Sequence, residues 1–126
     1  MTTASPKTVL VVDDDKCYCE IVRDTLAGAG FRVLVARNAL EALRINRTHP
    51  EPIHLALIDV AMPLMDGWAL AEHLWKKRPV RLLLMSGQGS LRAEGGNHAR
   101  RRIAFIEKPT TSAALLSAVR AALETA

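Results

Sequence analysis

The fold is decided by residues 57–67, which read LIDVAMPLMDG. An apolar run ends at Asp59, and Pro63 and the Asp66–Gly67 pair predict a turn after it. A helix is expected from about Trp68. Buried parallel strands are continuous apolar runs, and open α/β sheets carry their chemistry at the carboxyl ends of the strands. Asp59 is therefore a candidate site residue, although a lone aspartate in this position more often caps the turn that follows it.

Other apolar runs along the chain also end in polar side chains. Residues 8–12 lead into Asp13-Asp14-Asp15, residues 80–85 into Ser86-Gly87, and residues 103–106 into Glu107-Lys108-Pro109. Residues 31–35 form a further short run that is more typical of an edge strand. We interpret these runs, together with the one that ends at Asp59, as five β-strands.

Segments with helical spacing of apolar residues separate the strands. They cover residues 16–29, closed by Gly30, then residues 39–48 after an Asn38 cap, and residues 68–77. A last helix, capped by Thr110, Thr111 or Ser112, is expected to run to about Leu123. A fourth helix is expected within residues 88–102, but it should be short or frayed because the segment contains Gly89, Gly95 and Gly96.

Five strands that alternate with five helices predict βαβ units, a parallel sheet and right-handed connections. Helices on both faces of the sheet would leave the carboxyl ends of the strands at one edge. We therefore expect the Asp13–Asp14 pair, Asp59, Ser86 and Lys108 to meet there. This convergence favours a site over isolated caps.

The composition fits one domain and excludes several classes of protein. At 126 residues and 49% hydrophobic content, the chain can bury a single core. It has no apolar stretch near the ~18 residues of a membrane helix and no signal peptide, so we expect a cytoplasmic protein without a membrane partner. The net charge of +4 is mildly basic. The Arg100–Arg102 triplet lacks interleaved aromatic residues, so we interpret it as a solvated face and do not expect nucleic acid as a partner.

The two cysteines are expected to be reduced packing residues. Cys17 and Cys19 are two positions apart in a predicted helix, so their side chains point to nearly opposite sides and cannot bridge. No cysteine and histidine pattern completes a zinc site.

The expected cluster is suited to phosphoryl chemistry. Carboxylates that lie together repel one another, and a hard divalent cation such as Mg²⁺ relieves this conflict. The ammonium of Lys108 adds positive charge and Ser86 adds a hydroxyl donor. A metal ion, an ammonium and a hydroxyl together match a phosphoryl group, and Asp59 is then the natural nucleophile.

The chain closely resembles the receiver domain of two-component response regulators, from about Thr8 to Leu123. The resemblance rests on VVDDD at residues 11–15, Asp59-x-x-Met62-Pro63-x-Met65-Asp66-Gly67, MSG at residues 85–87, and Phe105-x-x-Lys108-Pro109. It implies one receiver domain over residues 1–126, with a core of about residues 8–123. The implied fold is a flavodoxin-like, CheY-like doubly wound sheet with strand order 2-1-3-4-5.

The resemblance also implies the roles of the site residues. Asp59 would accept phosphate from a sensor histidine kinase or a histidine phosphotransfer protein. Mg²⁺ would be bound by Asp14, Asp59 and the backbone carbonyl of Ala61, with Asp13 acting through water. Ser86 and Lys108 would contact the phosphoryl oxygens. The peptide bond before Pro109 is commonly cis in this family.

In the family, an aromatic residue at the position of Phe105 swings inward as the Ser86 hydroxyl moves toward the phosphate. Phenylalanine lacks the hydroxyl of the usual tyrosine, so Phe105 is either a switch that works by packing or an ordinary core aromatic. The glycine-rich residues 87–96 leave the usual dimer face in doubt, and we expect a monomer or a weak dimer. Neither the kinase nor the downstream protein target is indicated.

Three alternatives to a single-domain phosphoacceptor remain open. A magnesium-dependent aspartyl phosphohydrolase places a second aspartate two residues after its nucleophile, where this chain has Ala61. The expected protein is therefore not an enzyme beyond its own phosphorylation and dephosphorylation. A scaffold that acts without phosphorylation is the second alternative. The third is a receiver detached from a hybrid kinase or a larger regulator, although the polar N-terminal tail favours a complete single-domain protein.

Overall fold

The computed structural model describes residues 6–60, 67–77, 79–87, 104–108 and 110–124. Strands and helices alternate along most of the chain. The strands are β1 (Thr8–Val12), β2 (Arg32–Ala36), β3 (Leu55–Asp59), β4 (Arg81–Gly87) and β5 (Ala104–Lys108), and the helices are α1 (Lys16–Gly28), α2 (Ala39–Thr48), α3 (Gly67–Lys77) and α4 (Ser112–Glu124).

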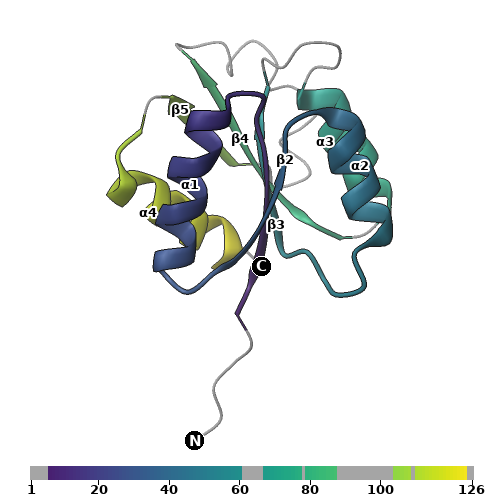
Figure 1. The fold of residues 1–126 in the computed structure, drawn as a ribbon, viewed down its shortest axis with the longest axis horizontal. Coiled ribbons are helices and arrows are strands. Elements are labelled where there is room, and N and C mark those ends of the chain that lie inside the picture. The colour runs from purple at the N-terminus through teal and green to yellow at the C-terminus, as the bar shows by residue number, and fades with distance from the viewer. Residues whose placement is uncertain (1–5, 61–66, 78, 88–103, 109, 125–126) are drawn as a thin grey trace, which may run out of the picture.

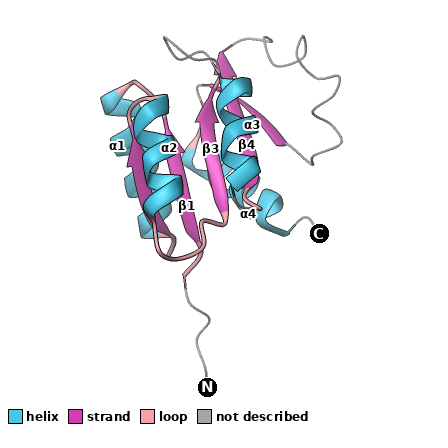
Figure 2. Ribbon diagram, turned by 90° about the vertical axis from the view of Figure 1, so that its right-hand side faces the viewer, coloured by secondary structure: helices cyan, strands magenta, loops and turns pink. Residues whose placement is uncertain are grey.

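The five strands form one parallel sheet with the order β2-β1-β3-β4-β5. This is the predicted order 2-1-3-4-5. Helices α1 and α4 cover one face of the sheet, and α2 and α3 cover the other (Figure 1). Figure 2 shows the molecule from the side of α2 and α3, with these helices in front of the strands. Because the strands are parallel, all their carboxyl ends lie at one edge of the sheet.

The alternation of side chains along each strand divides the core into two clusters. In β1, Val9 and Val11 pack with α1 and α4, whereas Leu10 and Val12 pack with α2 and α3. All four side chains are fully buried. A strand covered on both faces has no polar side, which explains why β1 reads as a continuous apolar run. The same alternation decides which face each site residue occupies.

The predicted helix ends are confirmed where the structure describes them. Gly30 follows α1 with φ +96°, and its N–H donates to the carbonyl of Ala27 at 3.0 Å, while Phe31 N–H donates to the carbonyl of Leu26 at 3.1 Å. This pair of bonds is a Schellman motif, which needs the left-handed conformation that glycine adopts without strain.

Side-chain caps begin two other helices. Asn38 accepts a hydrogen bond from Glu41 N–H at 2.8 Å at the start of α2. Of the three residues expected to cap the last helix, Thr111 does so, because its hydroxyl oxygen accepts from Ala114 N–H at 3.0 Å. These caps satisfy N–H groups that have no partner within the helix.

Two expectations about the helices and cysteines have different outcomes. The frayed helix expected within residues 88–102 lies outside the described residues, so the described helices number four. The cysteines do point apart, since Cys17 is exposed, Cys19 is buried, and both are free thiols.

Among the described residues, no helix is both long enough and apolar enough to span a bilayer.

Candidate functional site

The carboxylates predicted from separate segments meet at the carboxyl edge of the sheet. Asp13 directly follows β1, and Asp59 is the last residue of β3, the neighbouring strand. Carboxylate oxygens of Asp13, Asp14 and Asp59 all lie within 4.8 Å of one another. Asp13 is fully buried and Asp59 is 6% exposed, whereas Asp14 is exposed. The cluster therefore has two carboxylates inside the protein and one at its surface.

Lys108 supplies the positive charge of the site from the end of β5. Its Nζ donates to Asp13 Oδ2 at 2.8 Å and to Asp59 Oδ2 at 3.3 Å. The Lys108 side chain is 20% exposed, so the ammonium is only partly hydrated. One ammonium thus bridges two carboxylates that come from different strands. The predicted convergence of Asp13, Asp14, Asp59 and Lys108 is present in the structure.

Alternation along the strands explains why these side chains share a face. Asp59 is two residues beyond Leu57, and Lys108 is two residues beyond Ile106, and both apolar residues belong to the core on the α1 and α4 side. Asp13 is likewise two residues beyond Val11. The three charged side chains therefore continue the same face of the sheet past its apolar part.

Asp13 is held in place by contacts with the beginning of α1. Its Oδ1 accepts from Asp15 N–H at 3.0 Å, and its backbone carbonyl accepts from the Cys19 thiol at 3.1 Å. Its own N–H donates to the carbonyl of Ala36 in β2 at 3.1 Å. Because Oδ1 of Asp13 accepts from Asp15, Oδ2 is the oxygen that accepts the hydrogen bond from Lys108. Burial raises the pKa of Cys19 to about 11, so this thiol stays protonated as a donor.

Burial and the bond between Asp13 and Lys108 act in opposite directions on the pKa values of both residues. Burial raises the pKa of Asp13 above its ordinary 3.8, although hydrogen bonds from Lys108 and Asp15 oppose the change. Burial alone would lower the pKa of Lys108, but the hydrogen bond to Asp13 and the charges of Asp13 and Asp59 raise it above 10.5. Lys108 is therefore a cation at neutral pH.

Tyr18 is a site residue that sequence reasoning missed. It falls within the helix expected over residues 16–29 and was assigned no role in the site, but its ring lies under Lys108, with Nζ 4.5 Å from the ring centroid. Because α1 begins at the same sheet edge, its first turns face the site. The signal that could have identified Tyr18 is its place one helical turn after Asp14. Burial raises the pKa of its phenol above 10.0.

The carboxylate cluster suits a hard divalent cation. Its ligand atoms are all oxygens, and within the part of the chain that the structure describes, three carboxylates gather beside one ammonium, which leaves excess negative charge. An octahedral Mg²⁺ with ligands at about 2.1 Å spans oxygens roughly 3 to 4 Å apart, which is close to the observed 4.8 Å limit. Asp13, Asp14 and Asp59 are thus the residues that could hold the ion.

Ser86 and Phe105 occupy the opposite face of the sheet from Lys108. Ser86 pairs with Glu107 and Phe105 pairs with Leu84, so Ser86 and Phe105 come from neighbouring strands and share the face of α2 and α3. Ser86 is buried, and its role in the site stays a prediction. Phe105 is 39% exposed, and whether it is a switch or an ordinary core aromatic stays a prediction.

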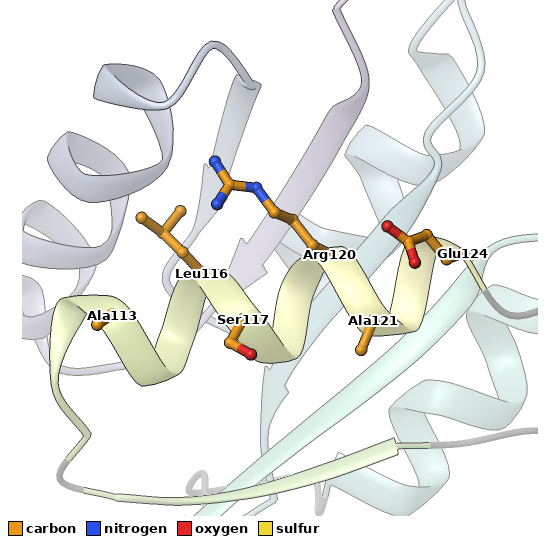
Figure 3. Close-up of a pocket in the computed structure, with 6 residues that line it drawn as sticks. All are labelled: Ala113, Leu116, Ser117, Arg120, Ala121 and Glu124. Atoms are coloured by element: carbon orange, nitrogen blue, oxygen red, sulfur yellow. The ribbon is translucent and has the colours of Figure 1, made fainter.

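Two other predicted site residues, Ala61 and Pro109, lie outside the described residues. The pocket drawn in Figure 3 is distinct from the carboxylate cluster. It runs along the outer side of α4 and is lined by Ala113, Leu116, Ser117, Arg120, Ala121 and Glu124.

Comparisons with known proteins place this geometry in a family. The model of the response regulator receiver domain matches residues 9–120. The receiver domain protein (CheY-like) from Methanospirillum hungatei JF-1 has a TM-score of 0.84 and 30% identity, with 95% of each chain covered. The receiver domain of the hybrid histidine kinase CckA has a TM-score of 0.77 and 26% identity, with 93% of this chain and 99% of that chain covered.

The chain covers only a small share of the length of the curated relatives that it matches. The two-component response regulator ARR11 of Arabidopsis thaliana is 36% identical over 81 residues, which is 64% of this chain and 16% of that protein. The family match nevertheless covers most of this sequence, and the sheet order agrees with the solved structures. The chain belongs to the response regulator receiver domain family of two-component signalling proteins.

Proposed function

We propose that Asp59 accepts a phosphoryl group from a histidine kinase or a histidine phosphotransfer protein, in a reaction that requires Mg²⁺. Receiver domains are signalling phosphoacceptors, and this chain carries the charge arrangement that such a reaction needs. The observation that carries the proposal is the Lys108 ammonium, which bridges Asp13 and Asp59 beside the exposed Asp14.

In the proposed reaction, one oxygen of Asp59 attacks the phosphorus of a phosphohistidine. The new P–O bond forms as the P–N bond breaks with its electron pair going to the imidazole nitrogen, which takes a proton from water. Lys108 compensates the negative charge that gathers on the phosphoryl oxygens. Mg²⁺, when bound, would neutralise carboxylate charge and orient the incoming group. Asp13 and Asp14 would hold it with Asp59, and the Ala61 carbonyl is the further ligand we propose.

Ser86 and Phe105 are the proposed means of reporting the modified state. The Ser86 hydroxyl would donate a hydrogen bond to a phosphoryl oxygen, and Phe105 would then repack on the shared face of β4 and β5. Their placement on neighbouring strands supports this coupling. The exposed position of Phe105 leaves apolar surface for the repacking to bury. Signalling would follow through contact with a protein partner.

The test is phosphorylation by acetyl phosphate, followed by mass spectrometry of the intact protein. The wild type should gain the mass of one phosphoryl group when Mg²⁺ is present and none when the ion is chelated. Asp59→Asn should gain none in either condition. A phosphoryl adduct that persists in Asp59→Asn would place the acceptor elsewhere.

A second measurement separates this function from that of a scaffold that acts without phosphorylation. A partner protein captured by the wild type should bind differently to the phosphorylated and unphosphorylated forms. Equal binding by the wild type and by Asp59→Ala, with and without acetyl phosphate, would favour the scaffold.

A further inference from the structure

Among the described residues, three groups contact the ammonium of Lys108, and two of them are carboxylates. Besides Asp13 and Asp59, it lies 4.5 Å from the centroid of the Tyr18 ring. A cation within about 6 Å of an aromatic centroid is attracted by the ring quadrupole, and the attraction strengthens as water is excluded. Tyr18 is partly buried and the Lys108 side chain is 20% exposed, so the contact is partly shielded from water.

The backbone of Tyr18 is linked to the site through Asp15, the N-cap of α1, and Asp13. Its backbone N–H donates to Oδ1 of Asp15, the N-cap of α1, at 3.1 Å. The N–H of Asp15 in turn donates to Oδ1 of Asp13 at 3.0 Å. This chain of hydrogen bonds links the first turns of α1 to the buried carboxylate. The backbone that carries the ring is thus held at a set place relative to Asp13, and the ring itself contacts Lys108.

The ring differs from the carboxylates in one chemical respect. Oxygens of Asp13 and Asp59 that bind a divalent cation are no longer fully available to the ammonium of Lys108. An aromatic face does not compete for that cation as a ligand. Tyr18 is therefore the neighbour of Lys108 whose contact can persist when the carboxylates turn to a metal ion.

We propose that Tyr18 is a positioning residue for Lys108. Its ring restrains the flexible four-carbon stem of the lysine, so that the ammonium is already in place when a phosphoryl group is bound at Asp59. This inference deepens the proposed function and rests on it. The ring face carries the effect, and the phenol hydroxyl does not, because the ammonium lies over the ring.

The hydroxyl supplies a matched control. It is buried and has no hydrogen-bond partner among the described residues. Tyr18→Phe therefore removes the hydroxyl and keeps the ring, whereas Tyr18→Leu removes the ring and keeps an apolar side chain. Comparing the two variants separates the aromatic face from the polar group.

The first measurement uses the protein without metal. Nuclear magnetic resonance of the Lys108 ε-methylene protons should show an upfield ring-current shift in the wild type and in Tyr18→Phe, and no such shift in Tyr18→Leu. Absence of the shift in the wild type would overturn the inference. This measurement does not depend on phosphorylation, so it remains decisive even if Asp59 is not a phosphoacceptor.

The second measurement is the affinity for beryllofluoride in the presence of Mg²⁺, since beryllofluoride forms a phosphoryl-like adduct with a carboxylate. Tyr18→Leu should bind about three- to tenfold more weakly than the wild type, and Tyr18→Phe within about twofold of it. In a Lys108→Met background, Tyr18→Leu should have no further effect, because the ring acts through the ammonium.

Three results would contradict the role of the ring. They are wild-type affinity in Tyr18→Leu, a loss in Tyr18→Phe equal to that in Tyr18→Leu, and a Tyr18→Leu effect that survives in the Lys108→Met background. If the wild type does not bind beryllofluoride at all, the proposed function fails, while the ring-current shift still decides the contact between Tyr18 and Lys108. Denaturant unfolding of each variant confirms that the compared proteins are folded.

Discussion

At the scale of single residues, the site depends on charge compensation by Lys108. Asp13 is fully buried and Asp59 nearly so, and a carboxylate removed from water is stable only with a partner. The ammonium between them is that partner in the absence of a metal ion. It holds together two carboxylates that would otherwise repel each other.

Lys108→Met should therefore destabilise the metal-free protein. We expect the free energy of unfolding to fall by about 2 kcal/mol, less than the roughly 3–5 kcal/mol for breaking a fully buried pair, because Lys108 is 20% exposed. Mg²⁺ should recover much of this loss, since the ion replaces the missing positive charge. Urea denaturation with and without Mg²⁺ measures both effects.

The control for this variant is a surface ion pair elsewhere in the molecule. Arg32 pairs with Glu51 at 2.6 Å, but the two side chains are 48% and 59% exposed. Arg32→Met should cost about 0.5 kcal/mol or less, and Mg²⁺ should not change that cost. Equal losses in Arg32→Met and Lys108→Met would contradict the account of the buried pair.

At the level of secondary structure, α1 begins beside the site, and its C-terminal end leads the chain into β2. Gly30 adopts φ +96°, which side-chain-bearing residues rarely do, whereas Gly28 is the last residue of the helix. A Cβ added at either glycine would meet nothing within 4 Å. The two positions thus differ in backbone conformation and not in available space.

Alanine substitution at these two glycines should have opposite effects. Gly30→Ala should lower the free energy of unfolding by about 1 kcal/mol, because alanine is strained in the left-handed region. Gly28→Ala should raise the free energy of unfolding by up to about 1 kcal/mol, because alanine favours the helix. Denaturant unfolding of both variants is the measurement, and a loss of stability in Gly28→Ala as large as in Gly30→Ala would refute this explanation.

The described elements were predictable because each one combines periodicity with a stop signal. The apolar runs that form β1 and β3 could be recognised directly, and Asn38 and Gly30 mark helix ends by known chemistry. The end of β4 was less predictable. The strand continues to Gly87, beyond the expected end at Met85, because pairing with β5 extends through Ser86 and Gly87. Strand pairing is a tertiary effect that local sequence does not contain.

At the scale of the whole molecule, His54 joins the amino ends of three strands. Its Nδ1 accepts from Thr8 N–H at 2.9 Å, its N–H donates to the carbonyl of Thr8 at 2.9 Å, and its carbonyl accepts from Arg81 N–H at 3.2 Å. Burial, and to a lesser degree the nearby Lys7, lower the pKa of His54 below 6.5. A protonated Nδ1 could not accept the bond from Thr8.

The stability of the protein should therefore fall as the pH is lowered. Above pH 6.5, His54 is neutral in both states and its contribution is complete. Below this value, the unfolded chain binds the proton more readily than the folded protein, so the free energy of unfolding decreases until the pH passes the lowered pKa. His54→Asn keeps an acceptor that does not titrate. Its free energy of unfolding should change less than that of the wild type between about pH 8 and about pH 5.

The arrangement of the site was predictable from the sequence because strand order brings carboxyl ends together. Asp13, Asp59 and Lys108 each follow a separate apolar run, so a parallel sheet gathers them at one edge. The contact between Tyr18 and Lys108 was not predictable, because it joins the first turns of a helix to the last residue of the fifth strand. The exposure of Phe105 was likewise not predictable, because the burial of a side chain on the edge strand β5 depends on which segments cover it.

In the proposed function, this edge of the sheet accepts a phosphoryl group on Asp59. The most direct measurement is reduction of the acetyl phosphate-treated protein with borohydride, which converts an acyl phosphate to an alcohol, followed by peptide mass spectrometry. The account predicts the converted side chain at Asp59 alone, and only when Mg²⁺ was present during phosphorylation. Conversion at Asp13, at Asp14 or at no residue would contradict it.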